Sequence, residues 1–212
     1  MAKARVYFTR EITPQAMDRL YDALGIRLSG KTAVKISTGE PGGHNFLQPA
    51  LIGPLTERLH GTIVECNTAY EGRRNTTQEH WKAIQEHGFL DIAPCDIMDE
   101  TGELALSVTN GMHLQENFVG AHLRNYDSML VLSHFKGHMM GGFGGALKNV
   151  SIGIASSNGK RWIHSAGVTK DKWVETPQDA FLESMAEADE AVISHMPVSY
   201  THLRAHETDQ YL

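Results

Sequence analysis

Short apolar runs alternate with helix-like segments along most of this chain, and this alternation most restricts its fold. We expect strands at residues 6–9, 33–37, 62–66, 91–96, 104–108 and 129–132. Cap residues and apolar spacing predict helices at residues 13–25, 51–59, 76–88 and 117–125, then after residue 145 and after residue 176. Strands that alternate with helices favour a parallel sheet. The sequence therefore predicts a single-domain α/β fold with a mainly parallel sheet and helices on both faces.

Composition limits the class of protein. The formal net charge of −6 over 212 residues argues against general binding of nucleic acid, which needs a basic surface. No apolar run has the length of a membrane span and the first residues carry no signal peptide, so we expect a cytoplasmic protein without a membrane partner. A local basic pocket is still compatible with this charge, and its candidate residues are Lys35, Lys136, Lys148, Lys160 and Arg161.

Three polar, glycine-rich loops follow predicted strands, at residues 38–45, 67–75 and 134–145. Ligands of parallel α/β sheets bind beyond the carboxyl ends of the strands. We therefore expect the three loops to converge on one crevice.

The stretch Ser133–His164 has the densest candidate chemistry. Its glycines allow a ligand to approach the backbone, and the helix expected at Ala146 would present free amide groups to an anion. The spacing matches neither a phosphate loop nor a dinucleotide fingerprint. A small anionic ligand is the expected partner, and the candidate binding residues are Lys136, Gly141, Gly142, Gly144, Gly145, Lys148, Asn149, Arg73 and Arg74. The alternatives are a loop that only turns the chain, a solvated Lys148, and one surface arginine.

Three histidines of the same stretch suggest a metal site. His134 and His138 are four residues apart, and His164 would complete a three-nitrogen site for a divalent metal. The alternative for each is a histidine hydrogen-bonded to the backbone. Glu40 is either a base or a turn residue, and Cys66 is expected to be a buried, inert thiol.

Several long motifs resemble one family. They are KISTGEPGGHNFLQP, CNTAYEGRRN, and SHFKGH followed by GFGGALKN. Over roughly residues 6–195 they are similar to the uncharacterised iron–sulfur-centre protein family, also called domain of unknown function 362. The resemblance implies an α/β domain joined to a ferredoxin-like segment with a four-iron four-sulfur cluster and a redox partner. This chain departs from that pattern, because Cys66 and Cys95 are its only cysteines and a usual cluster needs four.

The C-terminal residues differ in character from the rest. Residues 198–208 resemble a translated sequencing adapter, so we expect residues 1–196 to be the truncated α/β domain and 197–212 a non-native tail. His202 and His206 are therefore not counted as ligands. The sequence leaves two functions open. One is the ligand-binding part of an iron–sulfur redox protein, within an oxidoreductase; the other is a non-catalytic module that binds a small anion or a metal.

Overall fold

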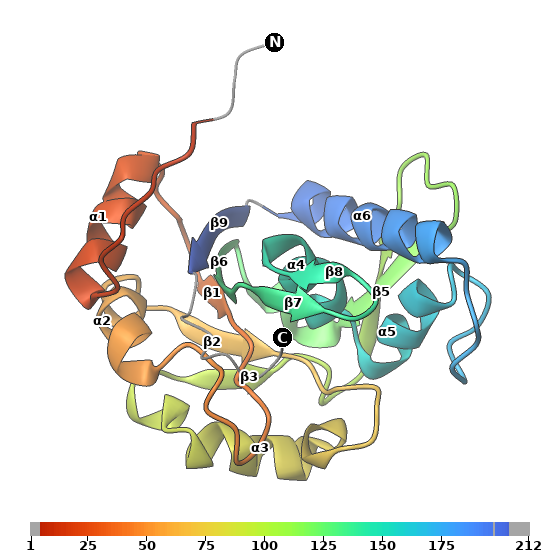
Figure 1. The fold of residues 1–212 in the computed structure, drawn as a ribbon, viewed down its shortest axis with the longest axis horizontal. Coiled ribbons are helices and arrows are strands. Elements are labelled where there is room, and N and C mark those ends of the chain that lie inside the picture. The colour runs from red at the N-terminus through yellow and green to blue at the C-terminus, as the bar shows by residue number, and fades with distance from the viewer. Residues whose placement is uncertain (1–4, 197, 204–212) are drawn as a thin grey trace.

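The computed structural model describes residues 5–196 and 198–203, and within them five strands form one parallel sheet (Figure 1). The strand order is β3-β2-β1-β6-β9. The bounds are Thr32–Lys35 for β1, Thr62–Glu65 for β2, Cys95–Ile97 for β3, Ser128–His134 for β6 and Val198–Leu203 for β9. The predicted α/β class with a parallel sheet is therefore confirmed.

The chain order of the sheet reverses beside β1. Strand β1 pairs in parallel with β2 on one side and with β6 on the other, where Thr32 lies opposite Ser128 and Lys35 opposite Val131. The connections from β1 and from β6 therefore leave the sheet in opposite directions. Such a switch point opens a crevice at the carboxyl ends of the two strands.

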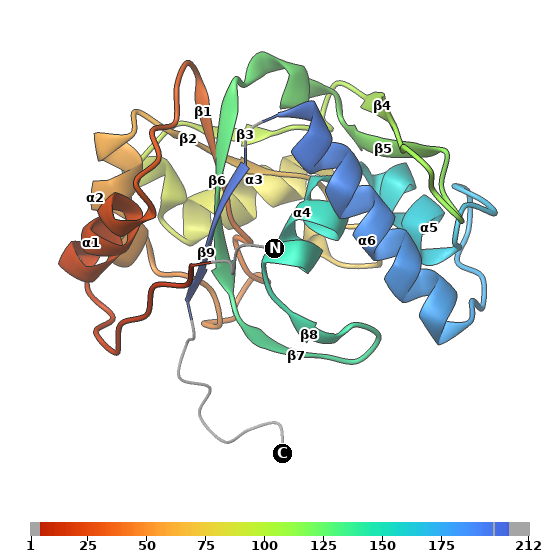
Figure 2. The same cartoon turned by 90° about the horizontal axis from the view of Figure 1, so that it is seen from above.

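Helices cover both faces of the sheet, as predicted (Figure 2). On one face, Val34, Ile63 and Leu130 of the strands pack with residues of α1 (Pro14–Leu24), α2 (Pro49–Arg58) and α3 (Thr77–Glu86). On the other face, Ala33 and Met129 pack with residues of α4 (Ala146–Ile154) and α6 (Gln178–His195). Alternate residues of each strand therefore face opposite layers, and both layers are apolar.

The remaining elements are two antiparallel ribbons, a helix and three short 3₁₀ turns. Strand β4 (Glu103–Ser107) pairs with β5 (Glu116–Gly120), and β7 (Lys136–His138) pairs with β8 (Gly142–Gly144). Helix α5 (Ser157–His164) packs beside β5. The turns are η1 (Arg73–Asn75), η2 (Phe89–Asp91) and η3 (Ala121–Asn125).

Local signals place some helix ends correctly. The Thr13 hydroxyl accepts a hydrogen bond from the amide of Ala16 at 3.1 Å and begins α1, and Gly25 ends it with φ of 66°. Thr76 and Glu79 have the spacing of a capping box at the start of α3, but the Thr76 side chain makes no cap hydrogen bond. That helix still begins at Thr77.

Other predictions were wrong. Residues 6–9 form no strand and leave Val6 and Phe8 largely exposed, since no neighbouring strand pairs with them. The helix expected at residues 117–125 is instead the end of β5 followed by η3, because pairing with β4 overrides the local preference.

Strand β9 and helix α5 were not predicted. Strand β9 pairs with β6 in parallel from Val198 opposite Met129 to Leu203 opposite His134. Residues 197 and 204–212 lie outside the described residues, so a non-native tail at 197–212 stays a prediction. No helix in the described part of the chain is both long and apolar enough to cross a membrane.

Candidate ligand-binding site

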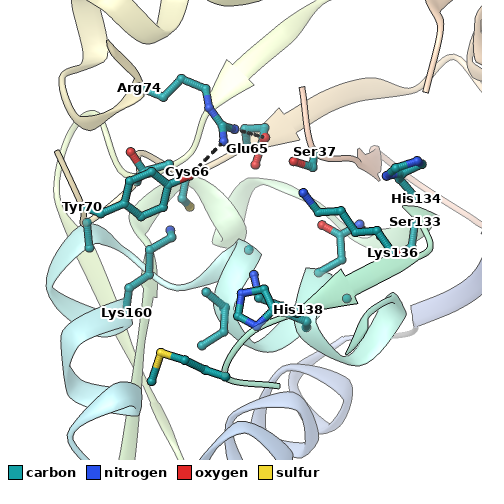
Figure 3. Close-up of a pocket in the computed structure, with 18 of the residues that line it drawn as sticks. Ser37, Glu65, Cys66, Tyr70, Arg74, Ser133, His134, Lys136, His138 and Lys160 are labelled. Atoms are coloured by element: carbon teal, nitrogen blue, oxygen red, sulfur yellow. Dashed lines mark hydrogen bonds and ion pairs between the residues drawn. The ribbon is translucent and has the colours of Figure 1, made fainter. Parts of the chain in front are cut away.

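A cavity of about 510 Å³ lies beyond the carboxyl ends of β1, β2 and β6, at the switch point of the sheet (Figure 3). Each of the three polar loops contributes to its wall, and representatives are Glu40, Arg74 and His138. Helix α4, helix α5 and the ribbon β7–β8 complete the lining. The loops therefore converge as expected, because parallel strands bring their carboxyl ends to one edge.

A buried carboxylate organises the inner wall. One oxygen of Glu65, at the end of β2, accepts a hydrogen bond from Lys35 Nζ at 2.9 Å. The other accepts from the amide of Thr38 at 2.9 Å and from Arg74 Nη1 at 3.3 Å. Burial would raise the pKa of Glu65, but the charges of Lys35 and Arg74 lower it to about 2. Glu65 is therefore ionised and fixes both cations in place.

Lys35 has no hydrogen left for a ligand. Besides Glu65, its Nζ donates to the carbonyl of Ile36 and to Asn149 Oδ1, the latter at 2.9 Å. The amide nitrogen of Asn149 in turn donates to Leu132 O at 3.2 Å and to Ser133 Oγ at 3.0 Å. Asn149, a predicted ligand residue, lines the cavity but also ties α4 to β1 and β6.

Lys148 is a half-buried lysine of the cavity wall, whereas Lys136 of the same wall is exposed. Lys148 lies in the first turn of α4, and among the described residues it has no hydrogen-bond or ion-pair partner. Burial lowers its pKa, and nearby positive charges, Lys136 first among them, lower it further, to about 8. By contrast, Lys160 of α5 donates to the carbonyl of Ala155. An amine that burial has desolvated and no carboxylate compensates favours an incoming anion.

The cavity is positive although the chain is acidic. Its described lining has five lysine or arginine side chains against two carboxylates, namely Lys35, Arg74, Lys136, Lys148 and Lys160 against Glu40 and Glu65. In Figure 3 the labelled cations extend from different elements toward the same space. Low-dielectric walls around charges of one sign strengthen the local field. The electrostatic potential inside the cavity is therefore positive.

His138 and His164 are neutral and differ in tautomer. His164 Nδ1 donates to the carbonyl of Lys160 at 2.7 Å, which leaves a lone pair on Nε2, and burial lowers its pKa to about 4. His138 Nδ1 accepts from the amide of Gly141 at 3.0 Å, so its Nε2 carries the proton. Burial, Lys148 and Lys136 lower the pKa of His138. His134 ends β6 and also lines the cavity.

The predicted metal site receives no support from this geometry. His164 presents the arrangement usual for a ligand histidine, with its other nitrogen bonded to a carbonyl, whereas Nδ1 of His138 accepts from an amide. Among the residues whose side chains the structure describes, no group of three His, Cys, Asp or Glu could hold a metal ion. Metal binding at His134, His138 and His164 stays a prediction.

The other predicted residues divide between the cavity and its surroundings. Gly144 and Gly145 line the cavity. Gly141 and Gly142 lie at the turn of the ribbon β7–β8 instead, where Gly142 has φ of 70°. Arg73 lies outside the cavity, paired with Glu79 and with Glu86.

Glu65 is the main site residue that the sequence interpretation missed. It follows the buried residues Ile63 and Val64, and a carboxylate at the end of an apolar strand could have identified it. Ser37, Ser133 and Tyr70 also line the cavity. Their residue types are common in loops, so no sequence signal marks them.

The two cysteines do not fit an iron–sulfur cluster. Cys66 is buried, its thiol donates to the carbonyl of Ile154 at 3.2 Å, and burial raises its pKa. Cys66 packs in the core on one face of the sheet and Cys95 against the core on the other. A cluster needs four accessible thiolates. The expectation that Cys66 is a buried thiol is confirmed.

Comparisons with known proteins agree with this architecture. A sequence model of the family described as Domain of unknown function (DUF362) matches residues 32–209. No curated protein matches the sequence. Similar solved structures include a protein from Thermotoga maritima, with a TM-score of 0.55, 15% identity and coverage of 92% of this chain and 51% of that one. Another is the lactate racemase apoprotein from Thermoanaerobacterium thermosaccharolyticum, with a TM-score of 0.57, 11% identity and coverage of 91% and 49%. The chain spans about half the length of these two structures, and identities this low show the fold alone.

Proposed function

This chain belongs to the DUF362 family, and we propose that its cavity binds a small organic anion, a carboxylate or a phosphate ester. The observation that carries the proposal is Lys148, a desolvated amine without a partner in the described residues, in a cavity where cations outnumber carboxylates. Ion pairing with a ligand would return to this amine the interactions that burial removed.

The dimensions and lining of the cavity support an organic ligand over a bare inorganic ion. A volume of about 510 Å³ lies within the range of sites for small molecules. The wall also has apolar side chains, among them Met140, Ile152 and Trp173. A ligand with one anionic group and a short carbon skeleton would contact both kinds of surface.

The expected redox function stays a separate prediction. It comes from the family resemblance, and the two cysteines of this chain do not fit the ligand set of a cluster. The anion site requires neither a cluster nor a redox partner. It is the simpler of the two functions that the sequence leaves open.

Titration calorimetry of the full chain with pyruvate and with inorganic phosphate tests the proposal. Lys148→Ala should weaken binding of the preferred anion about tenfold or more, because a hydrogen bond to a charged group contributes about 1.5–3 kcal/mol. Lys82→Ala is the matched control, since Lys82 is exposed on α3 and pairs there with Glu79. If wild type and Lys148→Ala bind the anion with equal affinity, and circular dichroism shows that both proteins are folded, the assignment of Lys148 as the anion-binding residue is refuted.

A further inference from the structure

Lys148 has chemical properties that binding alone does not require. The amine of Lys35 is fully used by three acceptors, and that of Lys160 donates to a carbonyl. Lys148 lines the same cavity with neither kind of bond among the described residues. Its nitrogen is therefore free to approach a carbon atom of a bound ligand.

The protonation state of Lys148 also favours reaction. An amine attacks carbon only when it is unprotonated. With the pKa of Lys148 at about 8, roughly a quarter of the amine is free at pH 7.5, against roughly 0.1% for a lysine of ordinary pKa near 10.5. Desolvation beside other cations is the usual way to activate a lysine nucleophile.

Neighbouring groups would hold and assist such a ligand. Lys136 lies near enough to lower the pKa of Lys148, so an anionic substituent could be bound beside the reacting amine. His164 lines the same cavity as Lys148, and burial first and then the charge of Lys148 lower its pKa. The lone pair on His164 Nε2 could accept a proton and return it.

We propose that Lys148 forms a Schiff base with a carbonyl compound that carries a carboxylate or phosphate group. This proposal rests on the proposed anion site. The free amine attacks the carbonyl carbon, a C–N bond forms, and the carbonyl π electrons move to oxygen. His164 accepts the proton that the nitrogen loses. The alkoxide oxygen of the carbinolamine takes this proton from His164 and a second one from solvent, and leaves as water while the nitrogen lone pair forms C=N. One amine, one carbonyl and one proton give an iminium ion and water, so no oxidant or reductant is needed.

Reductive trapping of the full chain tests this step. Incubation with pyruvate and sodium cyanoborohydride should leave a stable secondary amine on the peptide that contains Lys148, found by mass spectrometry. Glycolaldehyde phosphate in a parallel reaction shows whether a carboxylate or a phosphate is preferred. Lys148→Arg keeps the charge but cannot form the imine, and should lose the adduct, as should Lys148→Met. Lys82→Arg should keep it.

Trapping by wild type should increase with pH around a midpoint near 8. An adduct confined to surface lysines, or none, would overturn the Schiff base. Calorimetry with lactate, which has the carboxylate but no carbonyl, separates the two proposals. If lactate and pyruvate bind but nothing is trapped, the anion site stands and the Schiff base fails. If lactate, pyruvate and inorganic phosphate all fail to bind and nothing is trapped, both fail.

Discussion

Replacing Glu65 with glutamine should destabilise the protein in a way that depends on pH. Glu65 is buried between Lys35 and Arg74, and these charges hold its pKa at about 2 against an ordinary 4.5. That difference corresponds to about 3 kcal/mol of stability near neutral pH. Glutamine keeps the shape but removes the charge, so both buried cations lose their counter-ion.

The direction of this pH dependence follows from the lowered pKa of Glu65 in the folded state. The stabilisation by Glu65 is complete above about pH 5 and is lost as the pH falls toward 2, because the unfolded state then binds the proton more readily. At pH 3 less than about half of it should remain. The gap between wild type and Glu65→Gln should therefore narrow with acid.

Urea denaturation followed by circular dichroism at pH 7, 5, 4 and 3 measures this gap. Glu79→Gln is the control, because Glu79 pairs with Lys82 and Arg73 at the surface, where a pair contributes about 1 kcal/mol or less. A loss below about 1 kcal/mol at pH 7 for Glu65→Gln, or a gap that stays constant with pH, would refute the role of the ion pairs.

Three further predictions concern single sites. Lys148→Met should raise the free energy of unfolding at pH 7, as measured by urea denaturation. This gain should shrink between pH 8 and 10.5, because the buried lysine destabilises the wild-type protein only while it is protonated. An unchanged free energy of unfolding would contradict the burial of an unpaired charge. Gly159→Ala should lower stability by about 1–3 kcal/mol, since a Cβ would lie 1.9 Å from a backbone oxygen. At Gly137 an added Cβ would meet nothing within 4 Å, so Gly137→Ala should change the stability by less than about 0.5 kcal/mol. Equal shifts of the melting temperature in the two glycine variants would count against this packing argument. Thr13→Ala should cost about 1 kcal/mol through the lost cap of α1, whereas Thr76→Ala, which removes no cap bond, should cost less in the same melts.

Prediction from sequence succeeded where the cause is local. The cap and the terminal glycine of α1 act within one turn, so Thr13 and Gly25 set that helix without help from the fold. It failed for residues 117–120, whose conformation depends on pairing with β4. A propensity cannot report a partner strand that lies elsewhere in the chain.

The candidate site likewise has features that the sequence predicts and features that depend on distant partners. Convergence of the loops follows from the general rule that parallel strands end at one edge. The pairing of Lys35 with Glu65 depends on the register of β1 against β2, across 30 residues of sequence, and no local pattern encodes it. Arg73 and Arg74 show most simply where prediction from local sequence ends. The two adjacent arginines lie on opposite sides of the cavity wall because η1 directs one inward and the other to the surface.

The switch point also sets the order in which the molecule can be assembled during synthesis. Strand β1 must wait for β6, because Thr32 and Ser128 are 96 residues apart. At about 5–20 residues per second, a ribosome makes β6 about 5–20 s after β1. Until then the backbone amide and carbonyl groups on that edge of β1 have no partner strand. The cavity cannot exist earlier, since Glu65 belongs to the early part of the chain and Lys148 to the late part. A nascent chain that stalls before β6 would therefore expose the unpaired edge of β1 and could not bind the ligand.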